Sequence, residues 1–157
     1  MGHLPRGSRI RIQYDRVMRW YRRYQGHYSG MSHGISIDED CDDVLAFFIF
    51  CHQLKDWIIR DTEIPRRDIE RFIDENECLS ICADIANGIK HLGIDEGRTS
   101  RSGQDLRMHA GIYITGDRLS DVGLRMYITK DDGTQIEAFQ IAIECVDKWN
   151  EFLQRHL

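Results

Sequence analysis

Apolar residues recur with a helical period through most of this chain, and the period changes to two only between residues 110 and 130. A period near 3.6 is typical of amphipathic helices, whereas strict alternation is typical of half-buried strands. The pattern therefore predicts a mainly helical fold with one small sheet near the C-terminal end. The first helix is expected over residues 9–25, with Ile12 as the one misfit; its apolar arc consists of Ile10, Tyr14, Val17, Met18, Tyr21 and Tyr24.

Three further helices are expected before the sheet. Residues 38–60 are apolar nearly all round, which predicts a central helix, and their acidic start suits the positive end of the helix dipole. Pro65 suits the first turn of a third helix, which should stop at residues 74–76. A fourth helix is expected over residues 77–91, with Gly93 placed to end it.

The region of period two predicts a β-hairpin with strands over residues 110–116 and 122–130, in which Leu124, Met126 and Ile128 share one face. The turn at residues 131–133 indicates a short third strand before a last helix over 137–156. We predict a mainly α protein, a four- to five-helix bundle with a small antiparallel β-hairpin inserted before the last helix. The 157 residues fit a single domain, made of flexible or tag-derived residues 1–7, a bundle core 8–93, the hairpin 106–136 and the C-terminal helix 137–156.

The composition argues against a membrane protein. Hydrophobic residues make up 41% of the chain and charged residues 30%, which is typical of globular proteins. No apolar run approaches the roughly 20 residues that a transmembrane helix needs. We therefore expect a cytoplasmic protein that does not contact a membrane.

The cysteines are five in number and lie within or at the edges of predicted helices: Cys41, Cys51, Cys78, Cys82 and Cys145. An odd number, apolar neighbours and the lack of a Cys-x-x-Cys pair predict buried thiols in a reducing compartment. Cys78 and Cys82 share a helical face, but a zinc site would need two further ligands at matching spacing, and none is evident. We predict no metal and no cofactor.

Charge is unevenly distributed along the chain. The net charge is −5, yet residues 1–23 hold seven arginines against Asp15 alone. Arginines along one face of the first helix could bind successive phosphates of a nucleic acid. A solvated helix face, or one that pairs with an acidic partner subunit, is the alternative. The candidate nucleic-acid-binding residues are Arg16, Arg19, Arg22 and Arg23, together with Arg98 and Arg101 from the segment that follows the fourth helix.

The fourth helix carries polar residues on the face opposite its apolar arc. The helical period places Asp84, Asn87 and His91 together on that face. Asn87 could hold a phosphate, Lys90 could neutralise developing charge, and His91 could transfer a proton near neutral pH. These are the components of a metal-independent ribonuclease.

The central helix contains a second polar pair, His52 and Asp56, which lie one turn apart within an apolar stripe. Asp56 could fix the tautomer of the imidazole, either to lock the packing or to support a site. A metal site that combines these two residues with Asp84 and His91 is conceivable, but the spacing is unspecific.

Two more histidines, His27 and His33, lie in a segment rich in glycine and serine at residues 26–37. Histidines in a loop of undefined geometry are weak evidence for a ligand site. We expect both side chains to be exposed to solvent.

The order of elements, with His52-Gln-Leu-Lys-Asp-Trp on the central helix and Asp84-Ile-Ala-Asn-Gly-Ile-Lys-His late in the bundle, resembles an uncharacterised bacterial family and, more distantly, the HEPN superfamily. The resemblance covers residues 9–93. Many HEPN proteins are dimeric ribonucleases of toxin, abortive-infection and CRISPR systems, marked by an arginine followed after four to six residues by a histidine, often with an asparagine directly after the arginine. Asn87 and His91 match this pattern, whereas Ala86 stands at the arginine position.

Two functional classes remain open. The first is an RNA-associated protein, a homodimer that could act as a metal-independent endoribonuclease of a bacterial defence or toxin system. In it, His91 would act as acid or base, and Asn87 and Lys90 would bind phosphate. The second is a non-catalytic HEPN-like interaction module that binds a protein partner in such a system. Ala86 at the arginine position favours the second class, and the arginine-rich first helix favours the first.

Overall fold

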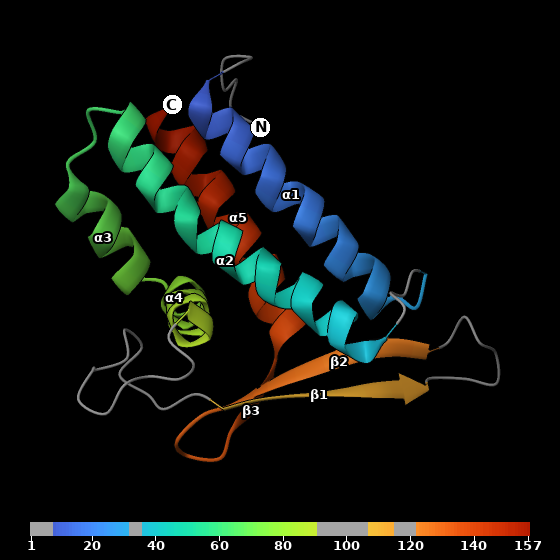
Figure 1. Cartoon of the computed structure of the whole chain (residues 1–157). Coiled ribbons are helices and arrows are strands. Elements are labelled where there is room, and N and C mark those ends of the chain that lie inside the picture. Colours follow the sequence, from blue (N-terminus) through green and yellow to red (C-terminus); the bar gives the residue numbers. More distant parts are fainter. Residues whose placement is uncertain (1–7, 32–35, 91–106, 115–121) are drawn as a thin grey trace.

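Figure 1 shows a computed structural model of the chain, which describes residues 8–31, 36–90, 107–114 and 122–157. In these ranges the chain forms the helices α1 to α5 and the strands β1 to β3. The helices form a bundle, and the small sheet lies at one end of it (Figure 1). The predicted architecture, mainly α with a small sheet inserted before the last helix, is confirmed.

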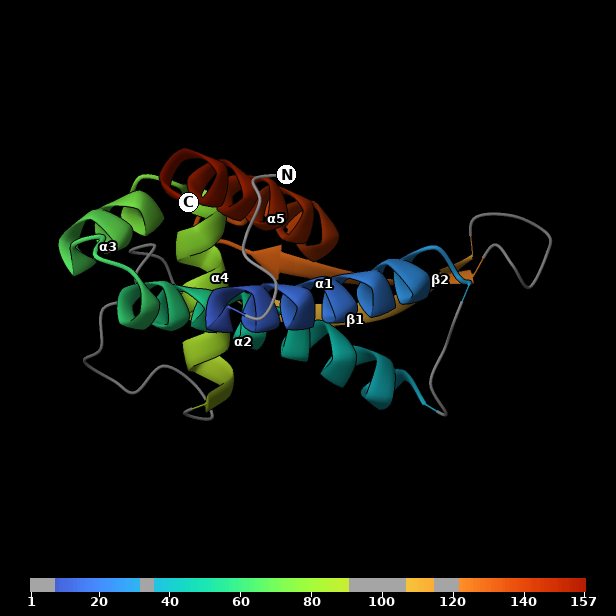
Figure 2. The same cartoon turned by 90° about the horizontal axis from the view of Figure 1, so that it is seen from above.

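The first two helices, α1 (Arg9–Tyr28) and α2 (Ile37–Asp61), lie side by side as a helical hairpin, as the view in Figure 2 also shows. Each begins at a serine N-cap. The hydroxyl of Ser8 accepts a hydrogen bond from the Arg11 amide at 3.2 Å, and that of Ser36 accepts one from the Glu39 amide at 3.3 Å. α2 packs against α1, α3, α4 and α5, so its predicted central place is confirmed.

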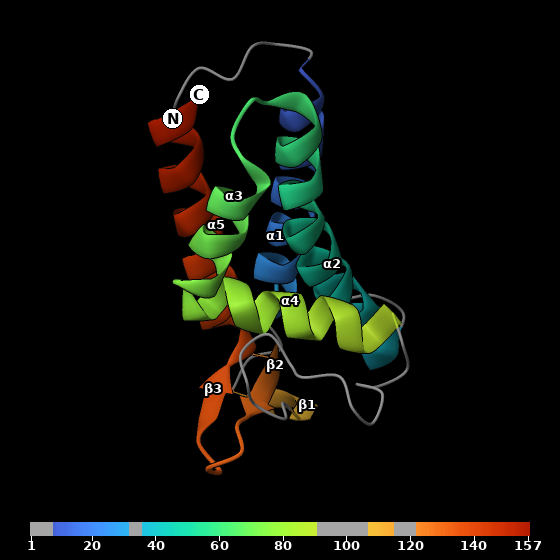
Figure 3. The same ribbon diagram turned by 90° about the vertical axis from the view of Figure 1, so that its left-hand side faces the viewer.

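The two following helices are α3 (Arg66–Asp74), with Pro65 at its N-cap, and α4 (Glu77–Lys90). The predicted bounds of both helices agree with these within one residue or so. α4 does not run along the bundle but crosses its end, next to the sheet (Figure 3). It packs there against α2, α3 and α5.

The last helix, α5 (Ala138–His156), completes the core between α1, α2 and α4. Its Phe139 ring lies among three tyrosine rings of α1, with the Tyr28 ring stacked on it at a centroid distance of 4.2 Å. At the other end of α1 the Tyr14 hydroxyl donates a hydrogen bond to Asn150 Oδ1 at 2.5 Å. These contacts join the first and last helices.

The sheet consists of β1 (Arg107–Ile114), β2 (Val122–Thr129) and β3 (Gln135–Glu137), antiparallel and in that order. The predicted face of β2 is confirmed, since Leu124, Met126 and Ile128 are all buried. The expected short third strand is also present. The turn before β3 depends on Gly133, whose φ of 82° is a conformation that residues with a side chain rarely adopt.

A helix that spans a bilayer needs about 20 predominantly apolar residues. Among the helices of the described ranges, none is both long enough and apolar enough to cross a membrane.

Candidate functional site

The polar face predicted for α4 is only partly present. Asp84 is 6% exposed and belongs to a run of nine consecutive buried residues from Cys78 to Ala86. The prediction that Asp84 faces outward is therefore wrong. The helical period assumes that one side of a helix meets water, but α4 crosses the end of the bundle and is covered on all sides over more than two turns.

The other predicted residues of this face divide into two groups. Asn87 is exposed near the end of α4, and Lys90 is the last residue of the helix. His91, Arg98 and Arg101 lie outside the described residues. Of the three candidate catalytic residues, the structure therefore places only the Asn87 side chain, at the surface.

The predicted pair on α2 is not buried as a unit. His52 is half-buried, whereas Asp56 is exposed and lines a shallow surface depression with Trp57 and Arg60. The expectation that both residues lie within an apolar stripe is wrong for Asp56. The depression is open to solvent, and Asp56 and Arg60 give it both signs of charge.

Several arginines of α1 are paired with acidic residues of the same chain. Arg9 lies 3.9 Å from Asp61, and Arg11 donates to Asp15 at 2.9 Å. The third pair joins Arg23 to Asp43 of α2, also at 2.9 Å. These ion pairs reduce the positive charge that the predicted basic face offers to a ligand.

Two arginines of α1, Arg16 and Arg23, flank an aromatic pair on the surface between α1 and α2. The rings of Trp20 and Phe50 stack with centroids 5.9 Å apart and planes at 12°. The Arg16 guanidinium lies 5.3 Å from the centre of the Phe50 ring, and that of Arg23 lies 4.8 Å from the Trp20 ring. We call these four residues the Arg–aromatic stack.

Arg19 lies beside the Arg–aromatic stack, because it is three residues after Arg16 and four before Arg23. Arg22 follows one turn after Arg19. Both side chains are exposed, and neither forms an ion pair with a residue of the described part of the chain. Together with the stack they make the most positively charged part of α1.

A histidine that we expected in solvent is instead buried. α1 continues past the predicted end at residue 25, and this places His27, which is 4% exposed, against the first turns of α2. Its Nδ1 atom lies 3.2 Å from an oxygen of Asp40, and its Nε2 atom lies 2.8 Å from one of Asp43. The three-residue spacing of these two acids, opposite a histidine at the end of the preceding helix, is the signal that could have revealed the cluster. His33 lies outside the described residues.

A second cluster was also missed, although its residues were correctly predicted to be buried. The sulfur atoms of Cys51, Cys82 and Cys145 all lie within 4.8 Å of one another in the core. Within the described ranges, no other three His, Cys, Asp or Glu residues bring one possible metal-ligand atom each this close together. Cys78 is buried nearby, and Cys41 is half-buried.

The acidity of these thiols differs because their surroundings differ. Burial raises the pKa of Cys82 and of Cys145 well above the usual thiol value. At Cys51, interactions with the neighbouring thiols of Cys145 and Cys82 outweigh burial and lower its pKa. The indole of Trp149 acts in the same direction, although its buried N–H forms no hydrogen bond of normal geometry with a described residue.

Comparison of the chain with protein-family models, with curated proteins and with solved structures finds no match in any of the three.

Proposed function

We propose that this protein is an RNA-associated protein that binds single-stranded RNA along α1. The observation that supports this best is the Arg–aromatic stack, with the exposed Arg19 and Arg22 beside it. Proteins that bind single strands without sequence preference combine a positively charged track with aromatic side chains. The candidate binding residues of α1 are Arg16, Arg19, Arg22 and Arg23.

The stack supports phosphate binding because it holds two guanidinium groups in place. The rings of Phe50 and Trp20 stack on each other, and the guanidinium of one arginine lies over each ring. Each guanidinium carries five N–H donors. Arg16 uses one on Gln13, and Arg23 pairs with Asp43, so donors remain for a phosphate. A guanidinium that is held in place loses less entropy when it binds.

Whether the protein also cleaves RNA depends on the end of α4. The catalytic form of the proposal uses His91 as acid or base, with Asn87 and Lys90 as phosphate ligands, as the resemblance to HEPN ribonucleases implies. The buried Ala86 argues for binding without cleavage, because an inward-facing position cannot present the arginine of the family pattern to a phosphate. We therefore propose RNA binding as the main activity of the protein.

One further observation favours the alternative, a module that binds a protein partner or a second copy of itself. Ile12 is 48% exposed and lies one turn before Arg16 on the same face of α1. Exposed apolar and aromatic residues interleaved with arginine are typical of the centres of protein interfaces. The same surface could therefore support the homodimer that the resemblance implies, or contact a protein partner of a defence or toxin–antitoxin system.

The binding proposal is tested by fluorescence anisotropy with a labelled single-stranded RNA of mixed sequence. We expect affinity to fall steeply between about 50 and about 200 mM salt. The double variant Arg19→Ser/Arg22→Ser should bind more weakly, and its salt slope should be smaller by about 0.7 per lost contact. The matched control is Arg66→Ser/Arg67→Ser on α3, which removes the same charge from two side chains that are 72% and 82% exposed.

Three outcomes distinguish the alternatives. Equal losses in both double variants would show a general charge effect and would contradict a site on α1. Equal RNA degradation by the native protein and His91→Ala in the presence of a chelator would exclude cleavage but not binding. If Ile12→Asp dissociates an oligomer in analytical ultracentrifugation while RNA affinity is absent in every protein, the face is a protein interface.

A further inference from the structure

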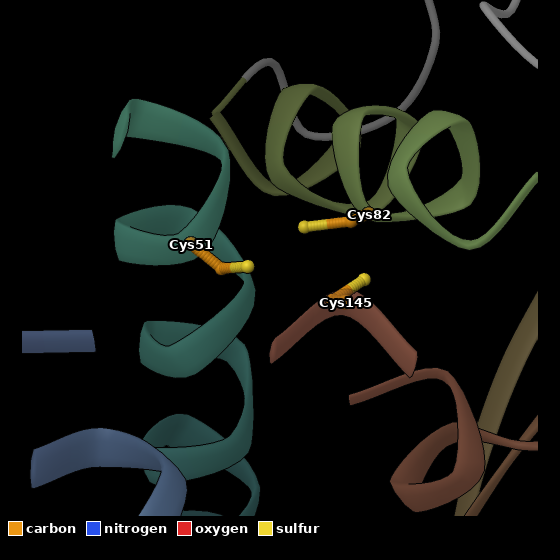
Figure 4. A group of neighbouring side chains, drawn as sticks. All are labelled: Cys51, Cys82 and Cys145. Carbon is orange, nitrogen blue, oxygen red and sulfur yellow. The ribbon is translucent and has the colours of Figure 1, made fainter. Parts of the chain in front are cut away.

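The three core cysteines come from three different helices: Cys51 from α2, Cys82 from α4 and Cys145 from α5. They are 0%, 1% and 0% exposed. Figure 4 shows the three side chains directed into the space between these helices, with their sulfur atoms facing one another. The convergence depends on the crossing of α4 over the end of the bundle, because this brings Cys82 to the other two.

The spacing of the sulfurs is close to that of a metal site. Thiolate sulfur lies about 2.3 Å from a bound zinc ion, and three sulfurs at that distance in a plane around a metal would be about 4.0 Å apart. The observed separations reach at most 4.8 Å. Side-chain adjustments of less than about 1 Å would therefore complete a three-sulfur site around a metal of this size.

The current partners of the thiols are consistent with such a site and do not prevent it. Cys82 donates to the Phe48 carbonyl at 3.4 Å, and Cys145 donates to the Cys78 carbonyl at 3.2 Å. Both are weak hydrogen bonds of a thiol, which would be lost together with the proton when the sulfur binds a metal. The buried N–H of Trp149, which has no partner among the described residues, is a donor near Cys51 that could stabilise a sulfur carrying negative charge.

The donor set selects the class of metal. Sulfur ligands favour soft ions and disfavour magnesium and calcium, which require oxygen. Structural zinc and iron–sulfur centres usually have four protein ligands. Here the compact group has three, since the Cys78 thiol contacts that of Cys145 but does not lie within 4.8 Å of all three sulfurs. A soft monovalent ion fits three sulfurs in a buried site better, because it leaves no further coordination position to fill.

We propose that Cys51, Cys82 and Cys145 form a buried three-sulfur binding site for a soft monovalent metal ion of the copper(I) type. No oxidation or reduction is involved: each thiol that binds as thiolate releases one proton to solvent, and the ion keeps its charge. A bound metal ion would link α2, α4 and α5 at the centre of the core. This site is independent of the proposed RNA-binding surface on α1.

The first test is a titration of the full chain with copper(I) under anaerobic, reducing conditions, in competition with a coloured copper(I) chelator. We expect one equivalent of copper(I) to be withdrawn from the chelator, and a higher melting temperature for the loaded protein. Because the site is fully buried, loading is expected to be slow and to become faster in mild denaturant. Uptake of less than half an equivalent at equilibrium would overturn the proposal.

Variants then locate the metal. Cys145→Ala and Cys51→Ala should each lose at least ten-fold in copper(I) affinity and the increase in melting temperature, while the matched control Cys41→Ala, outside the cluster, should retain both. Circular dichroism of each protein before loading reports whether it is folded. Equal loss in Cys41→Ala, or full retention in Cys145→Ala, would overturn the assignment.

A spectroscopic measurement on the native chain does not depend on any variant. X-ray absorption at the copper edge should show sulfur neighbours only, close to three per copper. Nitrogen or oxygen neighbours would place the ion on surface histidines or carboxylates and would overturn the proposal.

Discussion

The Nε2 atom of His27 lies 2.8 Å from Oδ2 of Asp43, across the junction between the end of α1 and the start of α2. The same imidazole contacts the buried Asp40 through its other nitrogen, at 3.2 Å. One ring therefore connects two carboxylates of α2 to α1, and Arg23 reinforces the contact through Asp43. This arrangement fixes the helical hairpin at the end where its connection lies.

Removal of the His27 ring is expected to destabilise the protein. His27→Ala should lower the free energy of unfolding by about 1–3 kcal/mol, because the buried Asp40 loses the imidazole as one of its partners. The exposed Asp38, in the same turn as Asp40, supplies the control: Asp38→Ala should cost less than about 1 kcal/mol. Urea unfolding monitored by circular dichroism measures both. Similar losses in the two variants would show that the cluster contributes little.

Removal of two tyrosine hydroxyls of α1 should change the stability of the protein in different directions. The Tyr24 hydroxyl is fully buried and has no hydrogen-bond partner among the described residues, so Tyr24→Phe should leave stability unchanged or raise it by about 1 kcal/mol. The Tyr14 hydroxyl donates to Asn150, so Tyr14→Phe should cost about 1 kcal/mol or more. Chemical unfolding of the two variants side by side checks the difference. A larger loss for Tyr24→Phe than for Tyr14→Phe would contradict the packing described.

Two glycines differ in what a methyl group would meet. A Cβ atom added at Gly123 of β2 would collide with the backbone carbonyl of Tyr28 and would lie 2.5 Å from Nη1 of Arg125. Gly123→Ala should therefore destabilise the protein by about 1–3 kcal/mol. In Gly88 of α4 it would meet nothing within 4 Å, so Gly88→Ala should stabilise the helix by about 0.5–1 kcal/mol. Melting temperatures of the two variants should move in opposite directions. A fully stable Gly123→Ala would mean that α1 and β2 are farther apart than described.

The helices and strands could be predicted because their periods are local properties of the chain. Ile12 is an example, since it was the misfit of the first apolar arc and is indeed exposed. The buried face of β2 also follows from its alternation. The predicted end of α1, at residue 25, is too early, because Gly26 is typical of the start of a loop. That error placed His27 in solvent.

The sites were harder to predict because they depend on contacts between elements. The period of its own helix predicts an outer face for Asp84, and no local pattern reveals that α4 crosses the bundle and is buried on all sides from Cys78 to Ala86. Cys51, Cys82 and Cys145 were correctly expected to be buried. Their convergence is a property of three helices packed together, and spacing within any one helix carries no information about it.

Alkaline pH should destabilise the protein through the tyrosines of α1. Burial raises the pKa of Tyr24 well above its usual 10.0, and burial also raises the pKa of Tyr14 and of Tyr21. The native state therefore holds these protons to higher pH than the unfolded state. The resulting stabilisation is complete below about pH 10 and is lost as the pH rises toward the native pKa values. Urea midpoints between about pH 8 and about pH 11 should fall, and they should fall less in Tyr24→Phe, which lacks the tyrosine with the most strongly raised pKa. An equally steep fall in that variant would mean that other groups cause the alkaline loss.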